Sequence, residues 1–161
     1  MKTALVGFGN PCHGDDGIGP AAARRLYESL PRRENIDLLE LASSDFGVME
    51  ALIGYERAVI IDALVDDESE VGTVRRIELP ESMEDGHLSP HTAGFSAAMA
   101  LARKLGLAVP GEIALYGVVI REPPAFSERL SPELEARLDE IARAIAAAEF
   151  TDQPRPAEGA G

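Results

Sequence analysis

The sequence predicts an α/β fold, a three-layer sandwich in which helices cover both faces of a largely parallel sheet. Apolar runs of strand length alternate with helix-forming segments along the chain, which is typical of proteins built from strand–helix–strand units. The run Ala58–Ile61 is apolar at every position, as expected for a central strand covered on both faces. The length of 161 residues suits one domain with a substantial core.

The first half of the chain predicts strand, helix, strand and helix in that order. The opening apolar run stops at a Gly-Asn-Pro loop. A helix should follow, because Pro20 suits a first turn and the neighbouring alanines favour helix. Two serines are candidate N-caps for the second helix. The four elements are Thr3–Phe8, Ile18–Leu30, Ile36–Leu41 and a helix from Ser43 or Ser44 to about Ile53.

The second half predicts further strands and two more helices. The central strand Ala58–Ile61 runs straight into Asp62, and the next strand mixes apolar with charged residues, as edge strands do. The third helix should stop at Gly106, and the last should open with Ser131 as its cap and Pro132 in its first position. The remaining ranges are an edge strand at Thr73–Leu79, a loop at Pro80–Pro90, a helix at Gly94–Leu105 and a strand at Glu112–Val119.

Composition narrows the class of protein. We expect residues 1–150 to form a single domain, and residues 151–161, rich in proline, glycine and polar side chains, to be a disordered tail. The formal charge is 15 − 28 = −13, which disfavours nucleic acids and anionic membrane surfaces as partners. Cys12 is the only cysteine, so an internal disulfide is excluded. No run of about 18 apolar residues occurs, so we expect no transmembrane helix and a cytoplasmic location.

The segment Gly7–Gly19 is rich in glycine and carries two adjacent carboxylates. A dinucleotide-binding loop would need a third glycine where Cys12 stands, and Asp15 and Asp16 would repel a pyrophosphate at the helix entrance. We therefore reject a nucleotide site. Acids at a helix start are often caps, which could explain one of the two, so we expect Asp15 to cap and Asp16 to point into a site. The glycines indicate tight turns or close approach of other backbone.

A second carboxylate and a histidine complete the candidates. Asp62 should lie at the carboxyl end of a central parallel strand, the edge where open α/β sheets bind ligands. It could equally bond backbone amides of the next loop. His13, His87 and His91 are alternative imidazoles. Two carboxylates and one imidazole would make a three-ligand metal site open to water or substrate, and imidazole suits nickel, zinc or iron.

These residues resemble the sequence pattern of a known family. The chain is similar to the hydrogenase maturation proteases, which remove a C-terminal extension from the large subunit of nickel–iron hydrogenases. The likeness spans roughly Lys2 to Ala148, and its first block is highly specific. Four blocks match in order: Gly7-Phe8-Gly9-Asn10 with Gly14-Asp15-Asp16-Gly17-Ile18-Gly19; Ile60-Ile61-Asp62-Ala63; Ser89-Pro90-His91 with Gly94; and Leu115-Tyr116-Gly117-Val118 followed by Leu130-Ser131-Pro132-Glu133.

The resemblance implies a fold, an activity and a site. It implies a twisted five-stranded sheet between helices, of the phosphorylase/hydrolase-like kind, and an endopeptidase of aspartyl or metal-dependent type. It implies that Asp16, Asp62 and His91 are the catalytic and nickel-binding residues. The nickel would arrive with the substrate, the hydrogenase large-subunit precursor, and a surrogate divalent metal could replace it in crystals.

One segment departs from the family pattern. Members often carry Asp-Gly-Gly-Thr and a further glycine after the second strand, whereas this chain has Leu41-Ala42-Ser43-Ser44-Asp45-Phe46-Gly47. That loop is expected to help recognise the substrate, so the client hydrogenase could differ. The residues assigned to substrate recognition are Asn10, Asp15, Ser44, Asp45 and Gly47. Two alternatives to a peptidase are a non-catalytic, metal-sensing assembly factor that binds the nickel precursor, and an α/β domain whose acids only cap helices and loops.

Overall fold

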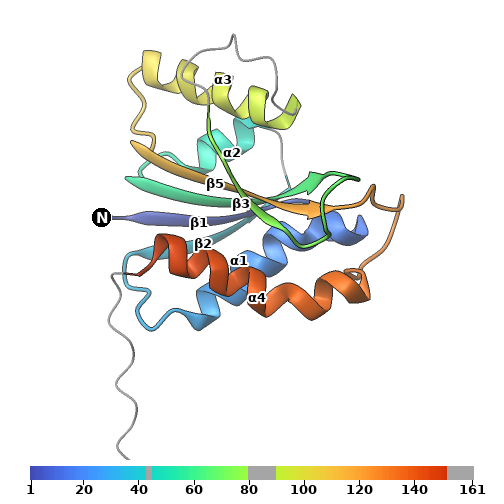
Figure 1. Cartoon of the computed structure of the whole chain (residues 1–161). Helices are drawn as coiled ribbons and strands as arrows, with labels where there is room; N and C mark the ends of the chain where they lie inside the picture. Colours follow the sequence, from blue (N-terminus) through green and yellow to red (C-terminus); the bar gives the residue numbers. More distant parts are fainter. Residues whose placement is uncertain (43–44, 80–89, 152–161) are drawn as a thin grey trace, which may run out of the picture.

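Five strands form one sheet in the order β2-β1-β3-β5-β4 (Figure 1). Four of them are parallel, and β4 runs antiparallel to β5 at one edge. The computed structural model describes residues 1–42, 45–79 and 90–151, and the side chains of residues 45 and 90–93 lie outside that description. The strands are β1 at Thr3–Phe8, β2 at Ile36–Leu41, β3 at Arg57–Val65, β4 at Val74–Ile77 and β5 at Glu112–Ile120.

Helices cover both faces of this sheet, so the predicted three-layer sandwich is confirmed (Figure 1). Helices α1 (Ile18–Ser29) and α4 (Pro132–Glu149) lie on one face, and α2 (Asp45–Ala51) and α3 (Pro90–Lys104) lie on the other. Successive strand residues point to opposite faces, so the central strands contribute to two cores. Leu5, Val59 and Ile61 pack with α1 and α4, whereas Ala4, Val6 and Ile60 pack with α2 and α3.

Local signals in the sequence set the end of α3 and the start of α4 where they were predicted. Gly106 has a φ of +72°, a left-handed conformation that glycine adopts without strain, and its N–H bonds the Arg103 carbonyl after α3 ends. Ser131 is the N-cap of α4, and its hydroxyl accepts the Leu134 N–H at 3.4 Å. Pro132 follows at the first helical position, where a missing N–H costs nothing.

Some boundaries differ from the sequence prediction. β3 does not end at Asp62 but continues to Val65, because β5 pairs with it as far as Val65↔Ile120. α3 begins at Pro90 rather than Gly94, and the rest of the predicted loop lies outside the described residues. α2 ends at Ala51, and its candidate caps, like nearly all of the predicted tail, also fall outside the described part of the chain.

The chain topology creates a switch point between β1 and β3. From β1 the chain crosses through α1 to β2 on one side, whereas β3 lies on the other side of β1. Ligands of open α/β sheets bind at the carboxyl edge at such a point. Among the helices that the structure describes, none has the length and apolar character needed to span a bilayer.

Candidate functional site

Asp62 lies where β1 leaves the sheet. The last pair between β1 and β3 is Gly7↔Ile61, so Asp62 is the next residue along β3. On its other side Asp62 still pairs with Gly117 of β5. The prediction that Asp62 ends its strand is therefore wrong, because β5 is longer than β1. Its position at the carboxyl edge of the β1–β3 pair nevertheless follows from the register.

The start of α1 is wedged against both strand ends at this edge. A Cβ added at Gly19 would lie 2.2 Å from the carbonyl oxygen of Phe8 and 2.5 Å from that of Ile61. Such distances are far below van der Waals contact, so only glycine lets the helix approach this closely. The glycines of the motif thus serve close backbone approach, as the sequence predicted, and they bring the residues preceding α1 beside β3.

Asp16 lies in the short 3-10 helix η1 (Gly14–Gly17) that leads into α1. Its side chain is partly buried, and its Oδ2 accepts the backbone N–H of Asn10 at 2.9 Å. Asn10 in turn accepts the N–H of Cys12 through its side-chain oxygen at 2.9 Å. The loop that leaves β1 therefore folds back onto the Asp16 carboxylate, and η1 itself contacts β3.

The Asp62 carboxylate is also partly buried and is oriented by backbone. Its Oδ1 accepts the N–H of Ala63 at 2.7 Å, a bond within β3 and not to the next loop, to which the alternative interpretation assigned it. Ala58 and Ile60 pack into the core beneath α2 and α3, so by alternation Asp62 presents its side chain on that same face. A carboxylate has about four lone-pair positions, so it can accept several partners at once.

His91 is in the first turn of α3, which begins at the same edge. The last turn of α3 leads to the amino end of β5, so its first turn lies toward the carboxyl ends of the parallel strands (Figure 1). The side chain of His91 is outside the described residues, and so is all of His87. Searched over the described residues alone, the structure holds no cluster of three metal-binding side chains. The set Asp16, Asp62 and His91 thus stays a prediction.

Asp15 has a different partner from the one expected. Its Oδ1 accepts the N–H of Ser131 at 2.6 Å and its Oδ2 accepts the Ser131 hydroxyl at 2.8 Å. In the part of the chain that the structure describes, neither η1 nor α1 has a side-chain cap. The expectation that Asp15 caps the helix after it is therefore wrong. No local pattern predicts this bond, because the two residues are 116 positions apart.

The other residues assigned to substrate recognition are dispersed. Asn10 lies in the loop after β1 and contacts Asp16. Asp45 and Gly47 belong to the first turn of α2, on the far face of the sheet from α1. Ser44 lies outside the described residues. The structure therefore joins Asn10 to the candidate site and leaves the role of the α2 segment a prediction.

A third carboxylate at this edge is held by a turn of its own. Asp66 follows β3, and its side chain accepts the N–H of Glu68 at 2.8 Å and pairs with Arg75 at 2.9 Å. The hydrogen bond from Glu68 is the main cause that lowers the pKa of Asp66 to about 2. Its oxygens are thereby engaged by the turn and by Arg75 of β4, which makes Asp66 a suitable comparison for Asp16 and Asp62.

A groove of about 710 Å³ borders the motif on the α1–α4 face. The loop residues Pro11, Gly14 and Gly17 form one end of it, and side chains of α1 and α4 form its walls. Neither Asp16 nor Asp62 lines this groove. Because Asp62 lies on the α2–α3 face, this groove is not the candidate site.

Known proteins share this architecture. A model of the family described as hydrogenase maturation protease matches residues 20–148, a range that contains Asp62 and His91 and begins after Asp16. The chain is 28% identical over 150 residues to the hydrogenase expression/formation protein HupD of Thiocapsa roseopersicina, covering 86% of this chain and 67% of that protein.

Solved structures agree with this match. The nickel–iron hydrogenase maturation protease HybD of Thermococcus kodakarensis is similar with a TM-score of 0.66 and 28% identity, over 92% of this chain and 99% of that one. The hydrogenase maturating endopeptidase HybD of E. coli has a TM-score of 0.75 over 94% of this chain and 93% of that one. Its 21% identity supports the fold alone.

Proposed function

The chain belongs to the hydrogenase maturation protease family and is thus a peptidase; we propose that it removes the C-terminal extension from a nickel-loaded precursor of a hydrogenase large subunit. The observation that carries this proposal is the wedge at Gly19, which brings η1 with Asp16 beside the end of the β1–β3 pair, where Asp62 lies. Two carboxylates from distant parts of the sequence thereby share one edge of the sheet.

The proposed chemistry uses an ion that belongs to the substrate. Asp16 and Asp62 would offer oxygen ligands and His91 a nitrogen ligand to the nickel that the precursor carries, and imidazole is a suitable ligand for nickel. Backbone amides help to orient both carboxylates, through Asn10 for Asp16 and Ala63 for Asp62. Binding of this kind would check that nickel is present and would bring the scissile bond to the carboxyl edge, where a bound metal can position or polarise a peptide carbonyl.

The test compares two forms of one precursor. The chain is incubated with nickel-loaded and with nickel-free large-subunit precursor, and the released peptide is identified by mass. We expect release from the loaded form only, together with little nickel on the purified chain, because three protein ligands hold a free ion weakly. Equal release from both forms would contradict the metal check, and no release from either would favour the non-catalytic assembly factor.

Variants give the test its control. Asp16→Asn keeps the shape of the side chain but removes its charge, so it should abolish release and let uncleaved precursor accumulate. Asp66→Asn makes the same change at a carboxylate of the same sheet edge that is engaged in its own turn. Its release rate per folded molecule should stay near that of the unmodified chain. An equal fall in release rate in both variants would mean that any loss of negative charge at this edge slows release. Asp16 would then have no specific role.

A further inference from the structure

The loop that carries Asp16 is fastened to the start of α4. The Ser127 N–H donates to the Cys12 carbonyl at 2.9 Å, and the Gly14 N–H donates to the Ser127 carbonyl at 2.7 Å. Two further bonds join the Asp15 carboxylate to the N–H and hydroxyl of Ser131, at 2.6 and 2.8 Å. Hydrogen bonds to an ionised acceptor are the stronger kind. We call the Asp15–Ser131 contact the clip.

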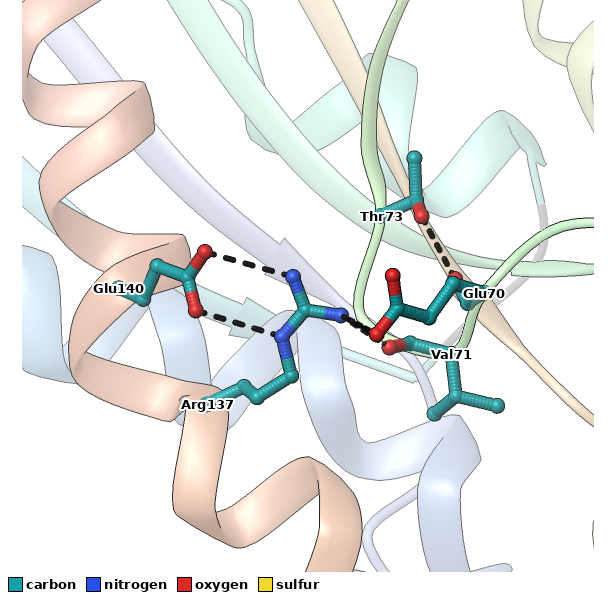
Figure 2. A network of polar contacts seen from close by, with 5 residues as sticks. All are labelled: Glu70, Val71, Thr73, Arg137 and Glu140. Atoms are coloured by element: carbon teal, nitrogen blue, oxygen red, sulfur yellow. Dashed lines mark hydrogen bonds and ion pairs between the residues drawn. The ribbon is translucent and has the colours of Figure 1, made fainter.

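The clip joins the loop to the start of α4, a helix that is anchored by its own contacts. α4 buries Leu134, Leu138 and further apolar residues in the core beneath α1. On its outer side, Arg137 donates to the Val71 carbonyl at 2.5 Å and contacts Glu70 at 3.6 Å, which joins α4 to the segment between β3 and β4 (Figure 2). Glu140, one turn along α4, accepts from the same guanidinium at 3.3 Å (Figure 2). Ser131 is therefore a fixed point to which a loop can be tied.

The clip bears directly on the orientation of Asp16. Asp15 and Asp16 are adjacent within the four-residue helix η1, so a change in one peptide plane moves the other carboxylate. Within the described part of the chain, the Asp16 side chain is held by a hydrogen bond from Asn10, which itself lies in a glycine-rich loop. The backbone of η1 must then fix much of its direction. Metal ligands depend on such supporting contacts, whose removal typically weakens affinity about 10–100-fold.

We propose that Ser131 is a positioning residue, which acts through Asp15 to aim the Asp16 carboxylate at the metal of the client. This inference rests on the proposed function, because it assigns Asp16 to that metal. It also explains why two acids stand side by side in the motif: Asp15 holds the loop, and Asp16 faces the ligand.

The experiment measures how well the chain tells the two precursors apart. Binding of nickel-loaded and nickel-free precursor is measured for the unmodified chain and for Ser131→Ala, with each affinity referred to the folded fraction. We expect Ser131→Ala to lower the ratio of the two affinities at least about tenfold. Loss of the helix cap alone would lower both affinities together and leave the ratio unchanged, which would overturn the inference.

Matched variants separate positioning from stability. Ser131→Thr retains a hydroxyl and should restore the ratio to within about twofold of the unmodified chain. Arg137→Ala removes a different polar contact of α4, shown in Figure 2, and should lower stability while the ratio is kept. If Ser131→Ala does not fold, Asp15→Asn weakens the clip from the other side and should also lower the ratio.

Failure of the inference is distinguishable from failure of the proposed function. Equal affinity of the unmodified chain for both precursors would overturn the proposed function and this inference with it. A strong preference for the nickel-loaded precursor that folded Ser131→Ala or folded Asp15→Asn retains in full would overturn the inference alone. A ratio lowered equally by Arg137→Ala would overturn it too, because any loosening of α4 would then suffice.

Discussion

The two edges of the sheet handle charge in opposite ways. At the amino edge, Arg57 at the start of β3 pairs with Glu149 at the end of α4, and Glu149 also accepts the hydroxyl of Tyr116. The Glu149 side chain is only 7% exposed, and the Arg57 guanidinium lies 5.4 Å from the centre of the Phe150 ring. The guanidinium and the carboxylate are thus paired in a largely buried position, where they cover the end of the core.

The two candidate carboxylates at the carboxyl edge accept backbone amides, whereas Asp66 beside them also pairs with Arg75. Asp16 accepts the N–H of Asn10, and Asp62 accepts the N–H of Ala63. An amide donor fixes the direction of a carboxylate without cancelling its negative charge, which suits the proposed role of Asp16 and Asp62 as ligands of a cation. The comparison teaches that acidic residues close to one sheet can serve stability at one end and recognition at the other.

The largest expected effect is a loss of activity when a carboxylate at the carboxyl edge is replaced. We predict that Asp62→Asn lowers the rate of peptide release from nickel-loaded precursor about 1,000-fold, the size of effect seen when one essential electrostatic contact is lost. The free energy of unfolding should change little, because the amide oxygen can still accept the Ala63 N–H. Release kinetics and chemical denaturation check the two halves of this prediction. A variant that unfolds easily yet cleaves normally would show that Asp62 serves stability instead.

The next effect concerns the amino edge and should show the reverse pattern. Glu149→Ala leaves Arg57 without its buried partner, and breaking a buried pair in this way costs about 3–5 kcal/mol of unfolding free energy. The release rate per folded molecule should be unchanged. Urea denaturation and an activity assay at low temperature measure both quantities. If folded Glu149→Ala released no peptide, the proposal that the amino edge serves stability and the carboxyl edge serves activity would be wrong.

A smaller effect at the amino edge is a dependence of stability on pH that comes from Tyr116. Burial and the hydrogen bond to Glu149 raise the pKa of Tyr116 from 10 to about 12. A raised pKa contributes stability that is complete below pH 10 and is lost as the pH rises toward 12, by at most about 3 kcal/mol. Tyr116→Phe should cost about 1 kcal/mol at neutral pH and flatten this alkaline decline.

The matched control for this prediction is Tyr55→Phe. Tyr55 also has a pKa raised to about 12, through burial and its contact with Asp37, but it lies outside the Arg57–Glu149 network. Thermal denaturation is followed up to about pH 12. Each single variant should still lose some stability as the pH rises, because the tyrosine that remains still titrates. An unchanged alkaline decline in Tyr116→Phe would show that its hydroxyl titrates equally in the folded and unfolded states.

The smallest effect tests how little the rim of the carboxyl edge contributes to stability. Phe126, between β5 and α4, is 70% exposed. Phe126→Ser should change the free energy of unfolding by less than about 0.5 kcal/mol, because an exposed side chain makes few contacts to lose. Denaturant midpoints are precise enough to detect a larger change in the free energy of unfolding. A larger loss would mean that this segment carries folding energy, and the contrast between the edges would weaken.

The fold could be predicted where local chemistry decides it. Strands β1 and β2 coincide with the predicted strands, and the end of α3 and the start of α4 follow from Gly106 and Ser131. The length of β3 could not be obtained in this way. Ala63-Leu64-Val65 continues the apolar run, but whether a strand goes on after an acid depends on the length of its partner β5.

The site was predictable only in outline. The positions of Asp16 and Asp62 at one edge follow from motif and topology, and the structure agrees with both. The partner of Asp15 did not follow from the sequence, because it is Ser131, a remote serine that the sequence predicts only as the cap of the last helix. Contacts between remote segments are decided by packing, and no pattern within the motif encodes them.

The wedge at Gly19 has a practical consequence for engineering. A library that randomises the whole motif to retarget the peptidase would return glycine at position 19 for every client, because any larger side chain meets the carbonyl oxygens of Phe8 and Ile61. Enrichment there would report that the protein assembles and would carry no information about what it cuts. Diversity is better placed in the first turn of α2, where Phe46 is 57% exposed.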